Sequence, residues 1–378
     1  MSICVVLVWS GNIQTITHRR ILLLTAMAKA GGGGRMTNMS RIQLVHNYDY
    51  IIWLDNLLSA WEEFKIGKKS RKDVQEFERN LMSNIISLHQ DLVNKTYKHS
   101  EYEAFKISDP KPRDIHKAKV RDRLLHHAIY RVLYPFFDRT FIADSYSCRV
   151  NKGTHKAINR FRKFAFQVSK NHTRTAWVLK CDIKKFFANI DHNILKIILS
   201  KCLFDTDVLW LLSQVIDSFS TQTNVRNSAI AENVTKGLPL GNLTSQLLVN
   251  IYMNEFDQFV KKKLKVKYYI RYADDFVILS EDKNYLEHLV PKISCFLEQK
   301  LKLQLHPGKI FIKTLASGID FLGWVHFTNH RVLRTSTKRK MIRKLKNNQK
   351  PATVQSYLGL LKHGNTEKLE RKIKSYQD

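Results

Sequence analysis

An alternation of short apolar runs with helical patterns between residues 175 and 327 restricts the possible folds more than any other feature. A β-α-β-β-α-β order of this kind makes a ferredoxin-like, split-βαβ sheet with helices on one face. The expected fold class of this part is α/β, in the sense of α+β. The apolar spacing predicts, in chain order, a strand at Ala176–Cys181, helices at Asp191–Ile198 and Leu243–Lys263, a hairpin of Tyr268–Tyr272 and Phe276–Ser280, a helix at Asn284–Leu301 and a strand at Ile319–Val325.

The region before this sheet is predicted to be helical. Between Tyr48 and Tyr97 apolar residues recur every three or four positions, which predicts a helical pair interrupted by the basic stretch 65–72. Two further helices are expected at Lys119–Phe137 and Lys156–Val168, with basic residues on their polar faces.

Residues 1–35 differ from the rest of the chain. Their two apolar runs, 3–9 and 21–28, are shorter than the roughly 20 residues that span a bilayer. A signal peptide places its basic residues before the apolar core, whereas Arg19 and Arg20 follow the first run. The glycines at 31–34 just precede Met36, and glycine codons are G-rich, so this run is consistent with a ribosome-binding site read in frame. We therefore predict an N-terminal extension at 1–35 and a translation start at Met36 or Met39.

The charge of the chain predicts a polyanionic partner. Lysine and arginine number 63 against 33 acids, which gives a formal net charge of +30. Nucleic acid is the favoured partner, because each neutralised phosphate releases condensed counterions. An anionic membrane surface is the alternative, but no basic amphipathic stretch stands out. The five cysteines are scattered without C-x-x-C spacing, which is typical of free thiols in a reducing cytosol and predicts a cytoplasmic protein without a zinc site.

Adjacent acids interrupt the apolar hairpin. Asp274 and Asp275 follow Tyr272-Ala273, and both arms of the hairpin are apolar. Two like charges in a low-dielectric setting need a compensating cation. Asp182 ends the first predicted strand, so neighbouring positions in the sheet would bring it to Asp274. Oxygen ligands of this kind favour two Mg²⁺ ions, with Mn²⁺ as a substitute, although an isolated Asp-Asp pair is often only a turn.

The order of several motifs resembles the reverse transcriptase family over roughly residues 48–365. The resemblance implies a right-hand polymerase with helical fingers at 36–174, a palm at 175–327 and a short, basic, helical thumb at 328–378. The motifs are 110–113 with 121–123, 145–149 with 153–155, 180–187, 237–246, 272–275, 305–309, 318–323 and 356–365.

The resemblance also assigns roles to single residues. Asp182, Asp274 and Asp275 would be catalytic, and the first two would hold the metals together with the Ile183 carbonyl, with Asp275 near the primer end and counted among the metal-site residues. Lys309 would act as a general acid toward pyrophosphate or simply contact the nucleic-acid backbone. The nucleotide site would comprise Lys111, Arg113, Phe187, Leu240, Gly241, Ser245 and Gln246, and the primer grip Phe321, Leu322 and Gly323. Phe187 would be a steric gate under the sugar or, alternatively, a core residue.

Within the family, the segment 240–246 discriminates most. Group II intron enzymes usually have glutamine where this chain has Leu240 and Ser-Pro where it has Ser245-Gln246. An apolar residue followed by Gly-x-x-x-Ser-Gln resembles the reverse transcriptases of diversity-generating retroelements, which copy a template RNA with errors at adenines. Leu240 would offer shape but no hydrogen bond to the incoming nucleotide, or would merely pack.

The resemblance implies a set of partners: template RNA, the cDNA primer and product, dNTPs and a small oligomeric accessory protein. Residues 331–378 hold 14 lysines and arginines against three acids, which suits a nucleic-acid-binding thumb. Two other functions stay open. One is a group II intron-like or phage-defence reverse transcriptase, and the other is an RNA-binding protein that keeps the fold without the chemistry.

Overall fold

The computed structural model describes residues 47–107, 112–221, 235–347 and 350–374. The predicted extension 1–35 and Lys111 lie outside these residues. Among the described residues, no helix is both long and apolar enough to cross a membrane. The described helices are α2 (Tyr48–Ile52), α3 (Leu54–Lys65), α4 (Lys72–Arg79), α5 (Leu81–Val93), α6 (Val120–Asp138), α7 (Thr154–Val168), α8 (His192–Ser200), α9 (Thr206–Asp217), α10 (Leu243–Gln258), α11 (Lys283–Leu301), α12 (Thr335–Asn347), α13 (Pro351–Leu361) and α14 (Glu367–Lys374).

Three antiparallel sheets complete the described structure. The strands are β1 (Glu103–Ile107), β2 (Arg113–Lys117), β3 (Trp177–Asp182), β4 (Tyr269–Tyr272), β5 (Asp275–Ser280), β6 (Phe311–Thr314), β7 (Ile319–Phe321), β8 (Trp324–His326) and β9 (Arg331–Leu333). The central sheet has the order β4-β5-β3-β6, which is the expected split-βαβ arrangement with the first strand between the last two. The mixed helix-and-sheet fold is therefore confirmed.

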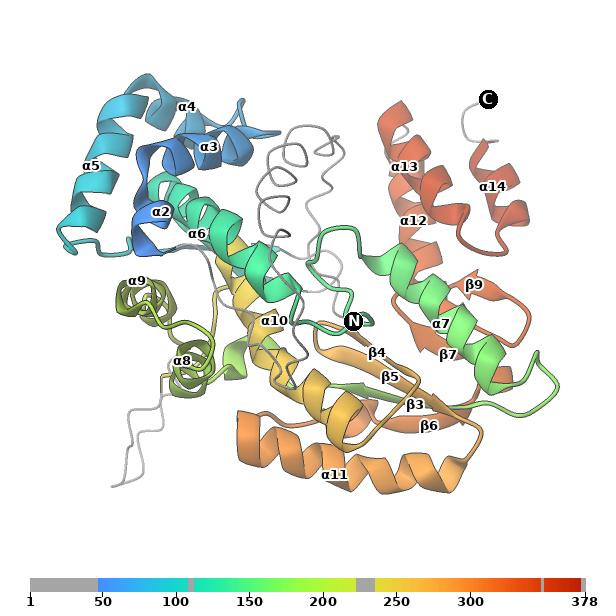
Figure 1. Ribbon diagram of the computed structural model, residues 1–378. Helices are drawn as coiled ribbons and strands as arrows, with labels where there is room; N and C mark the ends of the chain where they lie inside the picture. The colour runs from blue at the N-terminus through green and yellow to red at the C-terminus, as the bar shows by residue number, and fades with distance from the viewer. Residues whose placement is uncertain (1–46, 108–111, 222–234, 348–349, 375–378) are drawn as a thin grey trace, which may run out of the picture.

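The helices predicted within this unit, α10 and α11, cover one face of the central sheet as expected, and α7 from the preceding region covers the other face. Side chains on one face of β3 and β5, such as Leu179 and Phe276, join the large core that includes α10 and α11. Val178 and Val277 on the opposite face pack with Phe161 of α7. The physical reason lies in the strands, because β4 is buried at every position and β5 at all but its last. A strand without polar alternation has no face for water. Figure 1 shows α7 and α11 on opposite sides of the sheet.

The fourth strand of the central sheet is β6, not the predicted strand Ile319–Val325. β6 is short and largely half-buried, so it carries little apolar signal. The stretch 319–325 instead forms β7 and the start of β8. Leu322 and Gly323 both adopt positive φ angles, so the chain reverses direction between these two strands. These two strands belong to a separate sheet with β9.

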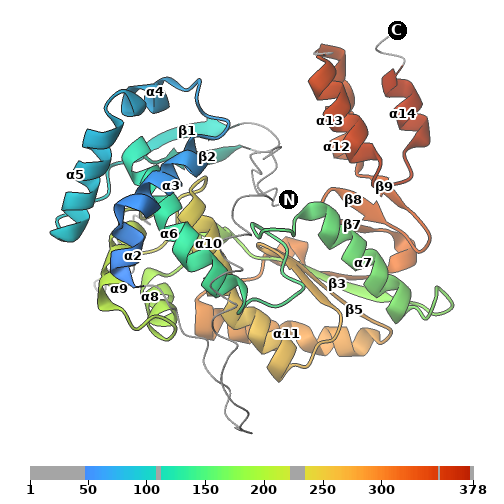
Figure 2. The ribbon, with the colours of Figure 1, turned by 45° about the horizontal axis from the view of Figure 1, so that its top comes forward.

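The N-terminal helices and the C-terminal helices lie at opposite ends of the central sheet. α2 to α5 pack with α6 at one end, and the predicted helical pair proves to be four helices, with the basic stretch 65–72 separating α3 from α4. α12 to α14 form a small core of their own with Trp324, Leu333 and Ile158 of α7. Figure 2 shows the two helical groups on either side of the region above β3 and β5.

Candidate active site

The turn between β4 and β5 carries two of the predicted acids. Tyr272 pairs with Asp275, so Ala273 and Asp274 alone connect the strands. Ala273 has a φ angle of +56°, in the left-handed region that costs a residue with a Cβ about 1–2 kcal/mol. The sequence thus holds Asp274 at the tip of a tight turn and Asp275 at the first position of a buried strand.

The third acid lies directly opposite. Asp182, the last residue of β3, pairs with Asp275, the first residue of β5. The two residues are only 5% and 3% exposed. The Ile183 backbone N–H donates to the Asp274 carbonyl oxygen at 3.2 Å, which joins the turn to the end of β3. The structure therefore brings Asp182, Ile183, Asp274 and Asp275 together at the same end of the adjacent strands β3 and β5.

Two lysines contact the buried carboxylates. Lys309 Nζ lies 2.8 Å from Asp182 Oδ1, and Lys180 Nζ lies 3.3 Å from Asp275 Oδ2. The other oxygen of Asp275, Oδ1, is buried and has no hydrogen-bond partner among the described residues. Burial raises the pKa of Asp275 to about 6, Lys180 opposes that rise, and the negative charges of Asp274 and Asp182 add to it. The positive charge around these acids is therefore incomplete.

This donor set fits a divalent cation. Carboxylate oxygens are the ligands that Mg²⁺ and Mn²⁺ prefer, and a buried oxygen without a partner offers a coordination position. Within the described part of the chain, no three His, Cys, Asp or Glu side chains already converge into a metal cage. Lys309 and Lys180 instead supply the positive charge at Asp182 and Asp275.

The loop before α10 connects the segment that follows β3 to strand β2. The Leu238 backbone N–H donates to the Phe187 carbonyl oxygen at 2.9 Å, and the His116 N–H donates to the Leu240 carbonyl oxygen at 3.3 Å. Gly241 has a φ angle of +106°, and a Cβ there would lie 3.1 Å from the Ile115 side chain. The loop thus runs from the half-buried Phe187 to strand β2.

The other residues of the predicted nucleotide site divide among three places. Arg113 is the first residue of β2, the strand that the loop contacts. Ser245 and Gln246 lie in the first turn of α10, where Ser245 is buried and Gln246 is half-buried. The structure therefore brings Leu240 and Gly241 against β2, whereas Lys111 is outside the described residues.

Comparison with known proteins identifies the family. Residues 97–326, well over half of the chain, match the family model described as reverse transcriptase (RNA-dependent DNA polymerase). The chain belongs to the reverse transcriptase family. Members of this family generally use divalent metal ions.

The chain is also similar to three curated proteins. It is 26% identical to protein YkfC of Escherichia coli (strain K12) over 61% of this chain and 66% of YkfC. It is 23% identical to the group II intron-encoded protein LtrA of Lactococcus lactis subsp. cremoris over 58% of this chain and 44% of LtrA. It is 20% identical to the putative COX1/OXI3 intron 2 protein of Saccharomyces cerevisiae over 54% of this chain and 29% of that protein. The chain thus spans less than two thirds of each relative's length.

The primer grip predicted for this reverse transcriptase lies in a different sheet from the acids. Phe321 ends β7 and is buried against Phe161 of α7, with ring centroids 5.7 Å apart. Leu322 and Gly323 form the β7–β8 turn, and the Gly323 carbonyl oxygen accepts a hydrogen bond of 3.0 Å from the Arg334 backbone N–H.

Two further residues near these acids were given no role from the sequence. Lys180 precedes Asp182 by two positions on β3, and this spacing puts both side chains on one face of the strand. The period of two was therefore a signal for Lys180. Arg334 forms an ion pair with Asp320, and burial lowers its pKa to about 10 while the charge of Asp275 opposes that shift. No local sequence signal indicates Arg334, because its relation to Asp275 depends on how two sheets pack.

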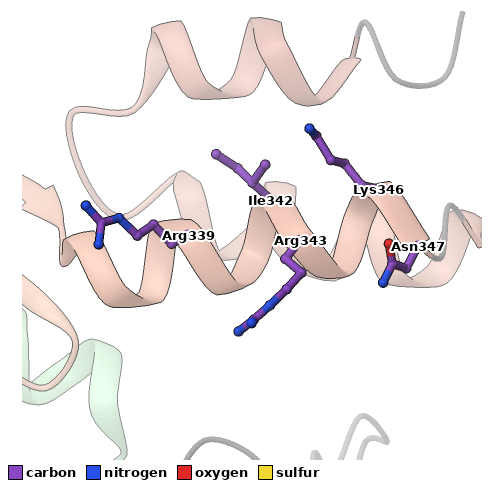
Figure 3. Close-up of a pocket in the computed structure, with 5 residues that line it drawn as sticks. All are labelled: Arg339, Ile342, Arg343, Lys346 and Asn347. Atoms are coloured by element: carbon purple, nitrogen blue, oxygen red, sulfur yellow. The ribbon is translucent and has the colours of Figure 1, made fainter.

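The basic C-terminal region presents cations on α12. Arg339, Ile342, Arg343, Lys346 and Asn347 line an open depression of about 270 Å³ (Figure 3). Guanidinium and ammonium groups at helical spacing suit the phosphates of a nucleic-acid backbone. This face matches the charge predicted for the thumb.

Proposed function

We propose that this chain is an RNA-directed DNA polymerase that transfers nucleotides with two metal ions held by Asp182, Asp274, Asp275 and the Ile183 carbonyl. The supporting observation is the Asp182–Asp275 pair with its unpartnered buried oxygen, at one edge of a sheet within the matched region. In the reaction, the primer's 3′-hydroxyl oxygen bonds to the α-phosphorus of a dNTP, its proton leaves, and the bond to pyrophosphate breaks. Bound Mg²⁺, or Mn²⁺ in its place, would lower the pKa of the hydroxyl and neutralise charge on pyrophosphate.

The surrounding residues would bind and orient the substrates. Arg113, with Lys111, would hold the triphosphate, because a guanidinium fork matches phosphate oxygens. Phe187 would lie under the sugar, where a 2′-hydroxyl would clash. Lys309, now 2.8 Å from Asp182, would donate a proton to the departing pyrophosphate.

The remaining predicted assignments belong to this proposal. Leu240, Gly241, Ser245 and Gln246 would shape the nucleotide site, and residues 321–323 would position the primer. We divide the chain into fingers at 36–174, a palm at 175–327 and a thumb at 328–378, after an N-terminal extension at 1–35. The proposed setting is the cytoplasm, with template RNA and the cDNA primer and product as partners.

We further propose that the enzyme serves a diversity-generating retroelement and makes cDNA with errors at adenines. Leu240 and the pair Ser245-Gln246 support this subtype. The Leu240 carbonyl oxygen accepts a hydrogen bond of 3.3 Å from the His116 N–H, which holds the Leu240 backbone against β2. A small oligomeric accessory protein would be a partner of such an enzyme.

Primer extension on an RNA template that contains all four bases tests the activity. With Mg²⁺ and dNTPs we expect cDNA from the wild type and none from the Asp274→Ala, Asp275→Ala variant. Asp55→Asn, an exposed acid on α3, is the control and should extend normally. Metal-dependent synthesis that survives in the double variant contradicts the proposal.

Sequencing the cDNA tests the subtype. Errors concentrated opposite template adenines support a diversity-generating retroelement, whereas faithful cDNA favours the group II intron-like or phage-defence alternative. Leu240→Gln should lower the adenine error frequency by providing a hydrogen-bonding amide. Leu240→Met, which keeps an apolar side chain of similar size, should leave the spectrum unchanged.

A further inference from the structure

A buried ion pair lies directly behind the acidic turn. Arg271 on β4 is 1% exposed and Asp257 on α10 is fully buried. Arg271 Nε donates to Asp257 Oδ1 at 2.8 Å, and Nη2 donates to Oδ2 at 2.7 Å. The Tyr269 hydroxyl donates to the same carboxylate at 2.7 Å. The Asp257 carboxylate is therefore fully engaged, which fixes the guanidinium in one orientation.

The same guanidinium holds the turn that carries the acids. Arg271 Nη1 donates to the Ala273 carbonyl oxygen at 3.1 Å. Ala273 is the residue with the left-handed φ angle, and such a conformation persists only where the surroundings fix it. Because Asp274 and Asp275 follow immediately, the position of the Ala273 peptide determines where both acids lie.

Arg271 also connects this turn to a segment from the other half of the chain. Its Nη2 donates to Ser145 Oγ at 3.2 Å. Its backbone N–H donates to the Asp144 carbonyl oxygen, and its carbonyl oxygen accepts from the Tyr146 N–H, both at 3.0 Å. One residue thus ties α10, the segment 144–146 and the acidic turn together.

We propose that Arg271 is a positioning residue of the metal site: Asp257 orients its guanidinium, which holds the Ala273 carbonyl so that Asp274 and Asp275 bind metal in the required geometry. This inference rests on the proposed function. Arg271 touches neither substrate nor metal, and its effect passes through the turn.

A purely structural ion pair is the competing explanation, and replacement of the whole network separates the two. Tyr269→Phe, Asp257→Leu and Arg271→Met together remove both charges and the hydroxyl. Buried ion pairs replaced by apolar residues often leave stability unchanged. The triple variant should therefore unfold within a few degrees of the wild type while the Ala273 carbonyl loses its donor.

The first measurement is binding of Mn²⁺ alone to the full chain, followed by electron paramagnetic resonance. We expect the triple variant to need roughly 10- to 100-fold more Mn²⁺ for half-saturation, as for other residues that orient metal ligands. In primer extension, kcat should fall by roughly the same factor, with KM for dNTP changed less than about threefold. The single variant Arg271→Lys keeps the charge but not the guanidinium fork. Its Mn²⁺ affinity should therefore lie between those of the triple variant and the wild type.

Arg131→Met with Glu63→Leu is the matched control, because it removes another Arg–acid pair in the N-terminal helices. It should bind Mn²⁺ like the wild type. Wild-type Mn²⁺ affinity and kcat in the triple variant overturn the inference, and so does a loss of kcat that only follows a lower melting temperature. If Asp274→Ala, Asp275→Ala removes no Mn²⁺ binding from the wild type, the proposed function fails and this inference fails with it.

Discussion

Two buried carboxylates, Asp257 on α10 and Asp275 on β5, differ in how completely they are neutralised. Asp257 accepts three hydrogen bonds, one from Tyr269 and two from Arg271, and both of its oxygens are engaged. Asp275 is similarly buried, but its nearest cation, Lys180, is 3.3 Å from one oxygen, and the other oxygen has no partner among the described residues. Burial alone therefore does not mark a functional acid. An acid left incompletely paired does, because such a group is costly unless a ligand completes it.

The largest expected effect concerns the incompletely neutralised acids Asp182, Asp274 and Asp275, here called the open site, and it is tested at Asp182. Asp182→Asn keeps the shape of the side chain but removes the charge that a metal needs. We expect the rate of primer extension to fall roughly a thousandfold or more, because metal stabilisation of the transition state is worth several kcal/mol. The melting temperature should change little. Activity within about tenfold of the wild type would contradict the assignment of the open site as the metal site.

The closed site, the network of Asp257, Tyr269 and Arg271, should show a large effect on stability. Asp257→Ala leaves the Arg271 guanidinium buried without its carboxylate, and the loss of one partner of a buried pair costs about 3–5 kcal/mol. Denaturant unfolding should measure this loss of stability. Glu255→Ala, an exposed acid on the same helix, is the control and should change stability by less than about 0.5 kcal/mol. A loss from Asp257→Ala no larger than this control's would show that the network contributes nothing to the fold.

The sequence predicted the open site better than the closed one. Asp182, Asp274 and Asp275 stand out as acids at the ends of apolar runs, and the strand order that joins them follows from short-range periodicity. Asp257 lies in a helix and Arg271 in a strand, 14 residues apart, and neither breaks a local pattern. Their pairing depends on how α10 packs on β4, which no sequence spacing specifies.

The strands that the sequence analysis missed or misplaced also depend on long-range packing and backbone conformation. β6 has only four residues and no fully buried position, so its place in the sheet comes from pairing with β3 rather than from its own composition. The apolar run at 319–325 looked like one strand because positive φ at Leu322 leaves no trace in hydrophobicity. Backbone conformation and long-range pairing were therefore the limits of the sequence prediction.

A pH-dependent stability measurement probes the open site without substrate. The pKa of Asp275 is raised from 3.8 to about 6, so the folded protein binds more protons than the unfolded chain between these values. Stability should therefore fall as pH rises from about 4 to about 6, by about 1–3 kcal/mol for this group. Asp275→Asn should lack this component and gain stability at pH 7. The comparison is denaturant unfolding of both proteins at pH 4.5 and pH 7, and identical pH profiles would contradict the prediction.

The smallest effect concerns Lys180, which partly neutralises the open site. Lys180→Met removes the cation that opposes the rise in the pKa of Asp275, so the pH at which stability is lost should move upward. At pH 7 the change in stability should be under about 1 kcal/mol, because the lost attraction is offset by no longer burying an ammonium group. Lys283→Met, which removes an exposed lysine at the start of α11, should leave the profile unchanged. A downward shift in the Lys180→Met profile would mean that Lys180 does not supply the positive charge at Asp275. Of the two lysines, only Lys309 would then neutralise the acids of the open site.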